Sequence, residues 1–124
     1  MVLTGIDLVE IKRIEKSLKN ERFLKENFGE RERQELAKKN FRPESVAACF
    51  AVKEAFLKVM KTGLCGAKLC EIELLHEESG APYLYLSGKA QLEVEKQGIK
   101  LCVSITHTKD LAQAIVIGEK NEID

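Results

Sequence analysis

The chain has 124 residues, of which 44% are hydrophobic and 32% charged, a composition typical of one globular domain and not of a fibrous repeat or a disordered chain. Its 20 basic and 20 acidic residues cancel, which argues against a protein built mainly to bind nucleic acid. No apolar run approaches the roughly 18 residues that a membrane span needs, and the first residues do not resemble a signal peptide. We therefore expect one cytoplasmic domain over residues 1–124, with no membrane contact.

The balanced charge conceals a difference between the two halves of the chain. Residues 1–62 hold 14 basic and 10 acidic side chains, whereas residues 63–124 hold 6 and 10. The positive excess is densest between Lys12 and Lys39. It indicates either a solvated helical surface or a binding face for an acidic partner or a phosphate ligand.

The first half of the chain predicts mainly helices. A short apolar strand ending near Asp7 comes first, followed by a helix whose apolar positions recur at helical spacing over 11–18. A loop or short continuation then carries three aromatic and aliphatic core anchors: Phe23, Leu24 and Phe28. A strongly charged helix is expected from Gly29 to about Lys39.

The central helix is expected from Ser45 to Met60, after Pro43, which suits a first helical turn. Its broad apolar surface predicts a place in the middle of the domain. Thr62 and Gly63 should end it, because glycine suits the left-handed C-terminal position.

The second half alternates in the manner of strands. Strands are predicted over 69–76, 83–86, 99–106 and 112–117, with a turn at 79–82 and a short helix over 87–96. Helices first and a mostly antiparallel sheet afterwards define an α+β protein. The four cysteines, at positions 49, 65, 70 and 102, lack the close spacing of zinc ligands, and we expect free thiols.

Three places carry side chains suited to chemistry. Asp7 lies among apolar residues and is either an N-cap of the following helix or a functional carboxylate. Glu54 and Lys58 stand four residues apart on the apolar helix, as a surface ion pair or as a metal-binding carboxylate beside a cation for phosphate. His107, in the run Ser-Ile-Thr-His-Thr-Lys (104–109), is an ordinary loop histidine, part of a phosphate-binding turn or a general base.

Six segments taken together resemble one family: Gly-Ile-Asp-Leu-Val-Glu-Ile (5–11), Phe-Ala-Val-Lys-Glu-Ala-Phe-Leu-Lys (50–58), Thr-Gly (62–63), Gly-Ala-Pro (80–82), Leu-Ser-Gly-Lys-Ala (86–90) and Ser-Ile-Thr-His-Thr-Lys (104–109). Their order is similar to that of the holo-(acyl carrier protein) synthases, the short bacterial type of 4′-phosphopantetheinyl transferase. The resemblance runs nearly from end to end of the chain.

The resemblance implies a Mg²⁺-dependent transferase of fatty acid biosynthesis. Such an enzyme moves the 4′-phosphopantetheine arm of coenzyme A to a serine of apo acyl carrier protein and releases adenosine 3′,5′-bisphosphate. The family usually forms homotrimers, in which each site is shared across a subunit boundary. Two other activities stay open: a Mg²⁺-dependent pyrophosphate hydrolase, and a degenerate module that binds coenzyme A or the carrier protein without turnover.

The resemblance also implies residue roles. Asp7 and Glu54 match the metal ligands, and the catalytic group consists of Glu54, Lys58 and His107, with Glu54 and His107 as alternative bases. Coenzyme A would be held by Lys58, Gly63, His107 and Thr108, and the acidic carrier protein by Arg13 and Arg22.

The chain departs from the family pattern in four places, at Leu3, Cys49, Glu26 and Lys61. Cys49 and Glu26 stand where arginine is common. Because a cysteine at position 49 carries no charge for a phosphate, this contact is either lost or replaced by a cation from Lys53 or Arg42.

Overall fold

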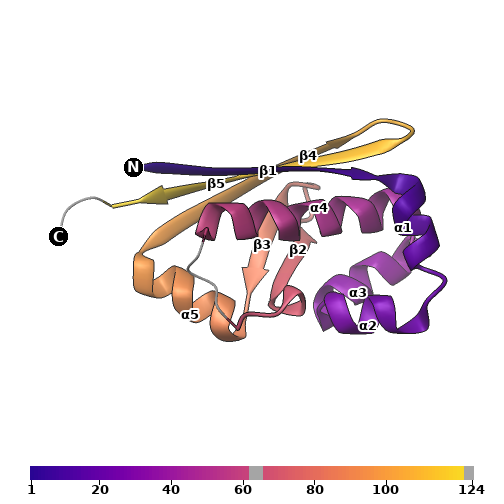
Figure 1. Cartoon of the computed structure of the whole chain (residues 1–124), viewed down its shortest axis with the longest axis horizontal. Helices are drawn as coiled ribbons and strands as arrows, with labels where there is room; N and C mark the ends of the chain where they lie inside the picture. The colour runs from indigo at the N-terminus through magenta and orange to yellow at the C-terminus, as the bar shows by residue number, and fades with distance from the viewer. Residues whose placement is uncertain (62–65, 122–124) are drawn as a thin grey trace.

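A computed structural model of the chain describes residues 1–61 and 66–121 (Figure 1). The helices are α1 (Ile11–Ser17), α2 (Glu21–Asn27), α3 (Glu30–Lys38), α4 (Pro43–Met60) and α5 (Gly88–Gln97), with one 3₁₀ turn, η1 (Leu69–Glu71). The strands are β1 (Val2–Glu10), β2 (Ile72–His76), β3 (Pro82–Leu86), β4 (Ile99–His107) and β5 (Leu111–Lys120). No helix in the described part of the chain is long and apolar enough to span a membrane.

The long strands form a three-stranded antiparallel sheet in the order β1-β5-β4. Asp7 lies opposite Ala114, which in turn lies opposite Ile105. One face of this sheet is covered by α4, which lies across it between the strands and the rest of the molecule (Figure 1). The three-stranded sheet therefore has one covered and one uncovered face.

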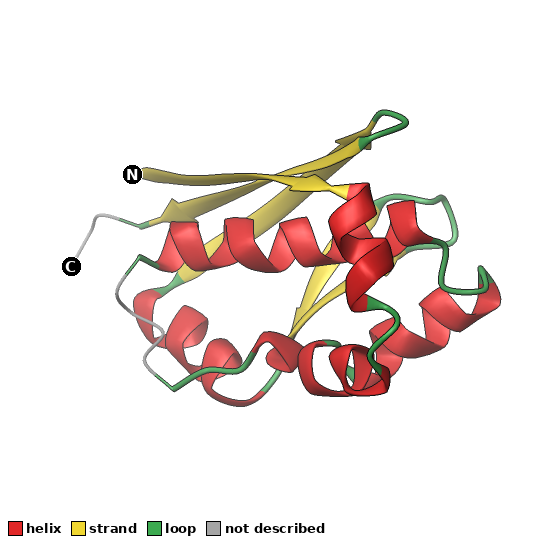
Figure 2. Ribbon diagram, turned by 45° about the vertical axis from the view of Figure 1, so that its right-hand side comes forward, coloured by secondary structure: helices red, strands yellow, loops and turns green. Residues whose placement is uncertain are grey.

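Helix α4 is the centre of the core. Pro43 starts it, as the sequence predicts, and eleven of its residues are buried. Buried side chains on nearly every face are expected for a helix that packs against a sheet on one side and other elements on the other. On the side away from the three-stranded sheet, α4 contacts the hairpin of β2 and β3, with α2, α3 and α5 around it (Figure 2).

The α+β prediction is confirmed, whereas several local expectations are wrong. Strand β1 continues to Glu10, so Asp7 lies inside a strand and is not an N-cap. Phe23 and Leu24 belong to a separate helix, α2. The expected strand over 69–76 begins only at Ile72, after η1, and four of its five residues are buried instead of alternating. Helix α4 ends at Met60, and the predicted stop at Thr62 and Gly63 lies outside the described residues.

Candidate active site

Gly5 allows β1 to lie directly on the backbone of α4. A Cβ atom at Gly5 would lie 1.9 Å from the carbonyl oxygen of Ala55 and 3.1 Å from Cβ of Lys58. No side chain fits in that space, so only glycine permits this approach. Because strand residues alternate between faces, Asp7 points to the same side of the sheet as Gly5, toward α4.

Lys58 and Asp7 meet across this contact. The Lys58 ammonium donates to the carbonyl oxygen of Ile6 at 2.7 Å and lies 3.3 Å from Oδ1 of Asp7. The Lys58 side chain is 55% exposed and that of Asp7 20%. Of the two alternatives for Glu54 and Lys58, the surface ion pair is not formed among the described residues: Lys58 pairs with Asp7 and so links the helix to the strand.

Glu54 lies one helical turn before Lys58, on the same face of α4. Helix α4 runs in the opposite direction to β1 (Figure 1), so the turn of Glu54 lies alongside the part of β1 that follows Gly5, where Asp7 is found. Glu54 is half-buried. Its side chain forms no hydrogen bond or ion pair with any described residue.

Asp7 and Glu54 have donor atoms that fit a magnesium ion. Both offer carboxylate oxygens, and Mg²⁺ is usually bound by one or two carboxylates, with phosphate oxygens and water completing its shell. Among the described residues no three His, Cys, Asp or Glu side chains gather as a metal-binding group. The arrangement thus suits a metal shared with a phosphate ligand better than a closed structural site.

His107 is not brought to this site within one chain. It is the last residue of β4, and β5 separates that strand from β1. His107 instead lines a cavity of about 180 Å³ bounded by α3, the first half of α4, β2 and β4, together with Cys49 and His76. Its Nδ1 lies 3.3 Å from the carbonyl oxygen of Thr108.

Thr108 closes the turn between β4 and β5. Its hydroxyl oxygen accepts hydrogen bonds from the backbone N–H groups of Asp110 at 3.3 Å and Leu111 at 3.1 Å. The carbonyl of Asp110 then accepts from the N–H of Ile11 at 2.9 Å, which ties this turn to the start of α1. Gly63, the remaining predicted coenzyme A contact, lies outside the described residues.

The two predicted docking arginines lie on different helices. Arg13 lines a shallow groove on α1 with three lysines and two glutamates: Glu10, Lys12, Glu15, Lys16 and Lys19. Arg22 is on α2, where it pairs with Glu26 at 3.0 Å on an exposed surface.

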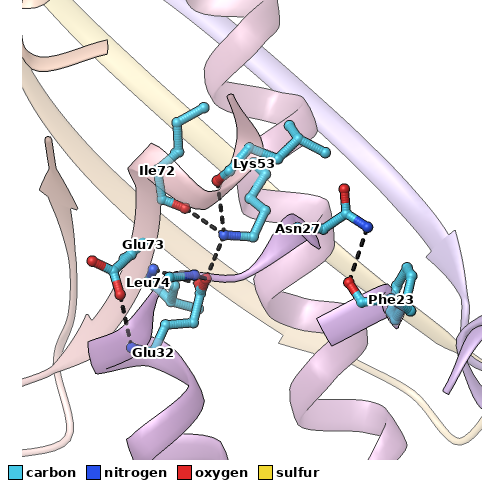
Figure 3. Close-up of polar contacts among 9 residues, drawn as sticks. Phe23, Asn27, Glu32, Lys53, Ile72, Glu73 and Leu74 are labelled. Carbon is cyan, nitrogen blue, oxygen red and sulfur yellow. Dashed lines mark hydrogen bonds and ion pairs between the residues drawn. The ribbon is translucent and has the colours of Figure 1, made fainter. Parts of the chain in front are cut away.

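The sequence reasoning missed a buried polar cluster behind the site (Figure 3). Lys53 and Glu32 are both fully buried and form an ion pair, and Lys53 also donates to the carbonyl oxygen of Ile72. Glu32 accepts from the N–H of Leu74 at 2.9 Å, and its own N–H donates to Oε1 of Glu73 at 2.9 Å. The cluster therefore links α3, α4 and β2.

This cluster rules out one expected replacement at Cys49. Lys53 has no exposed surface and is bound to Glu32, so it is not available to a phosphate at the surface. Arg42, the other expected substitute, is exposed and pairs with Glu44 at 2.8 Å. The sequence does indicate that Lys53 is buried. Cys49, four residues before it, and Phe56, three residues after it, are apolar and lie on the same face of the helix.

Burial dominates the electrostatics of this region. It raises the pKa of the Glu32 carboxyl, against the opposing effects of the Lys53 charge and the N–H of Leu74. Burial, and then the negative charge of Glu32, also raise the pKa of the Cys49 thiol well above its ordinary value. Cys49 is therefore an unreactive neutral thiol in the wall of the His107 cavity.

The chain belongs to the 4′-phosphopantetheinyl transferase superfamily, whose pattern matches residues 4–116. The sequence resemblance to this class of transferase is thereby confirmed.

Within this superfamily, the chain is similar to proteins that are named holo-(acyl-carrier-protein) synthases. It is 37% identical to a holo-(acyl-carrier-protein) synthase of Thermoanaerobacter sp., over 98% of this chain and 91% of that protein. The crystal structure of the holo-(acyl-carrier-protein) synthase of Neisseria meningitidis matches with a TM-score of 0.89 and 30% identity, over 97% and 100% of the two chains. That of Helicobacter pylori, solved in complex with coenzyme A, matches with a TM-score of 0.81 and 30% identity, over 94% and 100%.

Proposed function

We propose that this protein is a Mg²⁺-dependent transferase that converts apo acyl carrier protein to its holo form. The observation that carries the proposal is the convergence of Asp7, Glu54 and Lys58 on the β1–α4 contact in a chain of this superfamily. A relative's structure holds coenzyme A, which supports coenzyme A as the donor of the phosphopantetheine arm.

The reaction would form a bond between the serine oxygen of the carrier and the phosphorus that bears the pantetheine arm. The pyrophosphate bond of coenzyme A breaks, and adenosine 3′,5′-bisphosphate leaves. Asp7 and Glu54 would hold Mg²⁺, which neutralises the negative charge of the phosphates. The Lys58 ammonium, exposed beside them, would pair with a phosphate oxygen.

The serine proton needs a base within about 3 Å or one water away. Within one chain, Glu54 is the candidate base, because it lies one helical turn before Lys58 and its carboxylate is not paired with any described residue. His107 would serve only if it came from another copy, because β5 and α4 separate it from Asp7.

A homotrimer would supply that second copy. The uncovered face of the three-stranded sheet exposes large apolar side chains on β1: Val2, Ile6 and Leu8 are 65%, 51% and 57% exposed. Monomeric proteins rarely leave such a row uncovered. We therefore propose that three copies pack through this face and that each site combines Asp7 and Glu54 of one copy with His107 and Thr108 of the next.

The test is the intact mass of apo acyl carrier protein after incubation with the protein, coenzyme A and Mg²⁺, with and without a chelator. We expect a mass gain of one phosphopantetheine arm that the chelator abolishes. A gain that survives the chelator would contradict the metal requirement. Loss of coenzyme A without carrier modification would indicate a hydrolase, and intact coenzyme A with unmodified carrier would indicate a binding module.

Arg13 is proposed to hold the acidic carrier protein. It lies in the lysine-rich groove of α1, which would steer an acidic domain toward the site. We expect Arg13→Glu to raise KM for the carrier by about tenfold with little change in kcat, because a reversed charge weakens the encounter. The matched control is Lys96→Glu on α5, which should leave KM unchanged; an unchanged KM in Arg13→Glu would contradict the docking site.

A further inference from the structure

Lys58 is held on β1 by two different acceptors. Its ammonium donates to the Ile6 carbonyl at 2.7 Å and lies 3.3 Å from Oδ1 of Asp7. Strand β1 is an edge of its sheet, and an edge strand presents backbone carbonyls that have no strand partner. One ammonium, with three donors, thus satisfies a backbone carbonyl and compensates a carboxylate at the same point.

The Asp7 carboxylate is at the same time a proposed ligand of Mg²⁺. Apart from Lys58, no described residue forms a hydrogen bond or ion pair with its side chain. An ammonium and a divalent cation close to one carboxylate repel each other. The divalent cation therefore binds Asp7 more favourably if the Lys58 ammonium moves away.

Lys58 is able to move. Its side chain is 55% exposed and projects from the surface of α4 on a flexible four-carbon stem. Its ion pair with Asp7 is of the exposed kind, which contributes little stability. Leaving Asp7 would place the ammonium in solvent beside the metal, where phosphates of a ligand would lie.

We propose that Lys58 is an exchangeable counter-ion: a divalent cation displaces it from Asp7, and the released ammonium then pairs with the phosphates of coenzyme A. The inference rests on the proposed metal site of Asp7 and Glu54. Metal and coenzyme A would accordingly bind cooperatively, since each favours the position of Lys58 that the other needs.

The exchange is measured by Mn²⁺ binding, followed by electron paramagnetic resonance at low ionic strength without the carrier protein. We expect Lys58→Met to bind Mn²⁺ about tenfold more tightly than the native protein, the size expected when a nearby positive charge is removed. Added salt should reduce the difference in Mn²⁺ affinity between Lys58→Met and the native protein, because it screens the charge of Lys58. Coenzyme A should then tighten Mn²⁺ binding more in the native protein than in Lys58→Met.

Two control variants separate exchange from general electrostatics. Lys61→Met removes the same charge one turn later, where no contact with Asp7 exists among the described residues, and should bind Mn²⁺ like the native protein. Lys58→Arg retains the charge and should also bind like the native protein. Thermal melting of each variant shows that the fold is retained.

The outcomes distinguish the inference from the proposed function. Native protein that binds Mn²⁺ with the same affinity as Lys58→Met would overturn the exchange and leave the metal site standing. An increase in Mn²⁺ affinity in Lys61→Met as large as that in Lys58→Met would also overturn the exchange. Native protein and Lys58→Met that both fail to bind Mn²⁺ would overturn the metal site and the exchange together.

Discussion

Gly5 determines how closely the strand that carries Asp7 approaches the helix that carries Glu54 and Lys58. The absent Cβ leaves room for the carbonyl oxygen of Ala55, which no side chain at this position would tolerate. The geometry of the candidate site thus depends on one hydrogen atom in place of a methyl group.

We expect Gly5→Ala to destabilise the fold by about 1–3 kcal/mol, the usual cost of overpacking, and to lower transferase activity more than the stability loss explains. The added methyl group must push β1 away from α4, and Asp7 moves with it. Urea unfolding and carrier modification below the unfolding transition measure the two effects. Lys96→Ala, at an exposed position of α5, is the control; native stability in Gly5→Ala would contradict the close packing.

At the scale of secondary-structure elements, the buried pair of Lys53 and Glu32 connects α3 and α4 behind the site. Breaking a buried ion pair leaves an uncompensated charge and typically costs about 3–5 kcal/mol. Both side chains are fully buried, so this cost applies here in full.

We expect Lys53→Met alone to destabilise the protein by about 3 kcal/mol or more, because the Glu32 carboxylate is left buried. Combining it with Glu32→Gln should recover part of the loss, since glutamine keeps an oxygen for the N–H of Leu74 and carries no charge. Urea unfolding of the single and double variants gives the coupling energy. Strictly additive effects would show that the two side chains do not act as a pair.

The elements also show what the sequence can predict. Apolar periodicity and Pro43 placed α4 within a few residues, because burial on most faces leaves a strong pattern. The extent of β1 was missed because the apolar residues Ile6 and Leu8 lie on the uncovered face of the sheet, whereas Gly5 and Asp7 face α4. This arrangement obscures the usual alternation. The cluster of Lys53, Glu32 and Glu73 was missed because its members lie far apart in the sequence.

The sequence likewise predicted some features of the candidate site and missed others. Lys58 was expected beside Glu54 from helical spacing, whereas its contact with Asp7 depends on a strand and a helix that meet only in the folded chain. The residue types were therefore predictable from motifs, and their pairing was not.

At the scale of the whole molecule, one chain carries two separated parts of the proposed site. Asp7 and Glu54 lie at the β1–α4 contact, whereas His107 lies at the end of β4, beyond β5, in the cavity that Cys49 and His76 also line. The uncovered sheet face offers a surface through which another copy would bring the two parts together.

Mixed trimers test this arrangement. Asp7→Ala and His107→Ala should each be inactive alone, and co-refolding them should restore part of the native activity, because some sites then combine an intact Asp7 with an intact His107. Mixing two batches of the same variant is the control. Absence of restored activity in trimers shown to contain both chains would contradict a shared site.

The proposed function requires Asp7 and Glu54 at the β1–α4 contact for phosphopantetheine transfer. Its most direct test is the rate of mass gain of apo acyl carrier protein with native protein, Asp7→Asn and Glu54→Gln, beside Glu95→Gln as a surface control on α5. We expect both site variants to remain folded and to lose at least about 100-fold in rate, as is typical when a group that stabilises transition-state charge is removed, while Glu95→Gln keeps the native rate. Near-native transfer by Asp7→Asn or Glu54→Gln would contradict the proposed role of these two carboxylates as metal ligands.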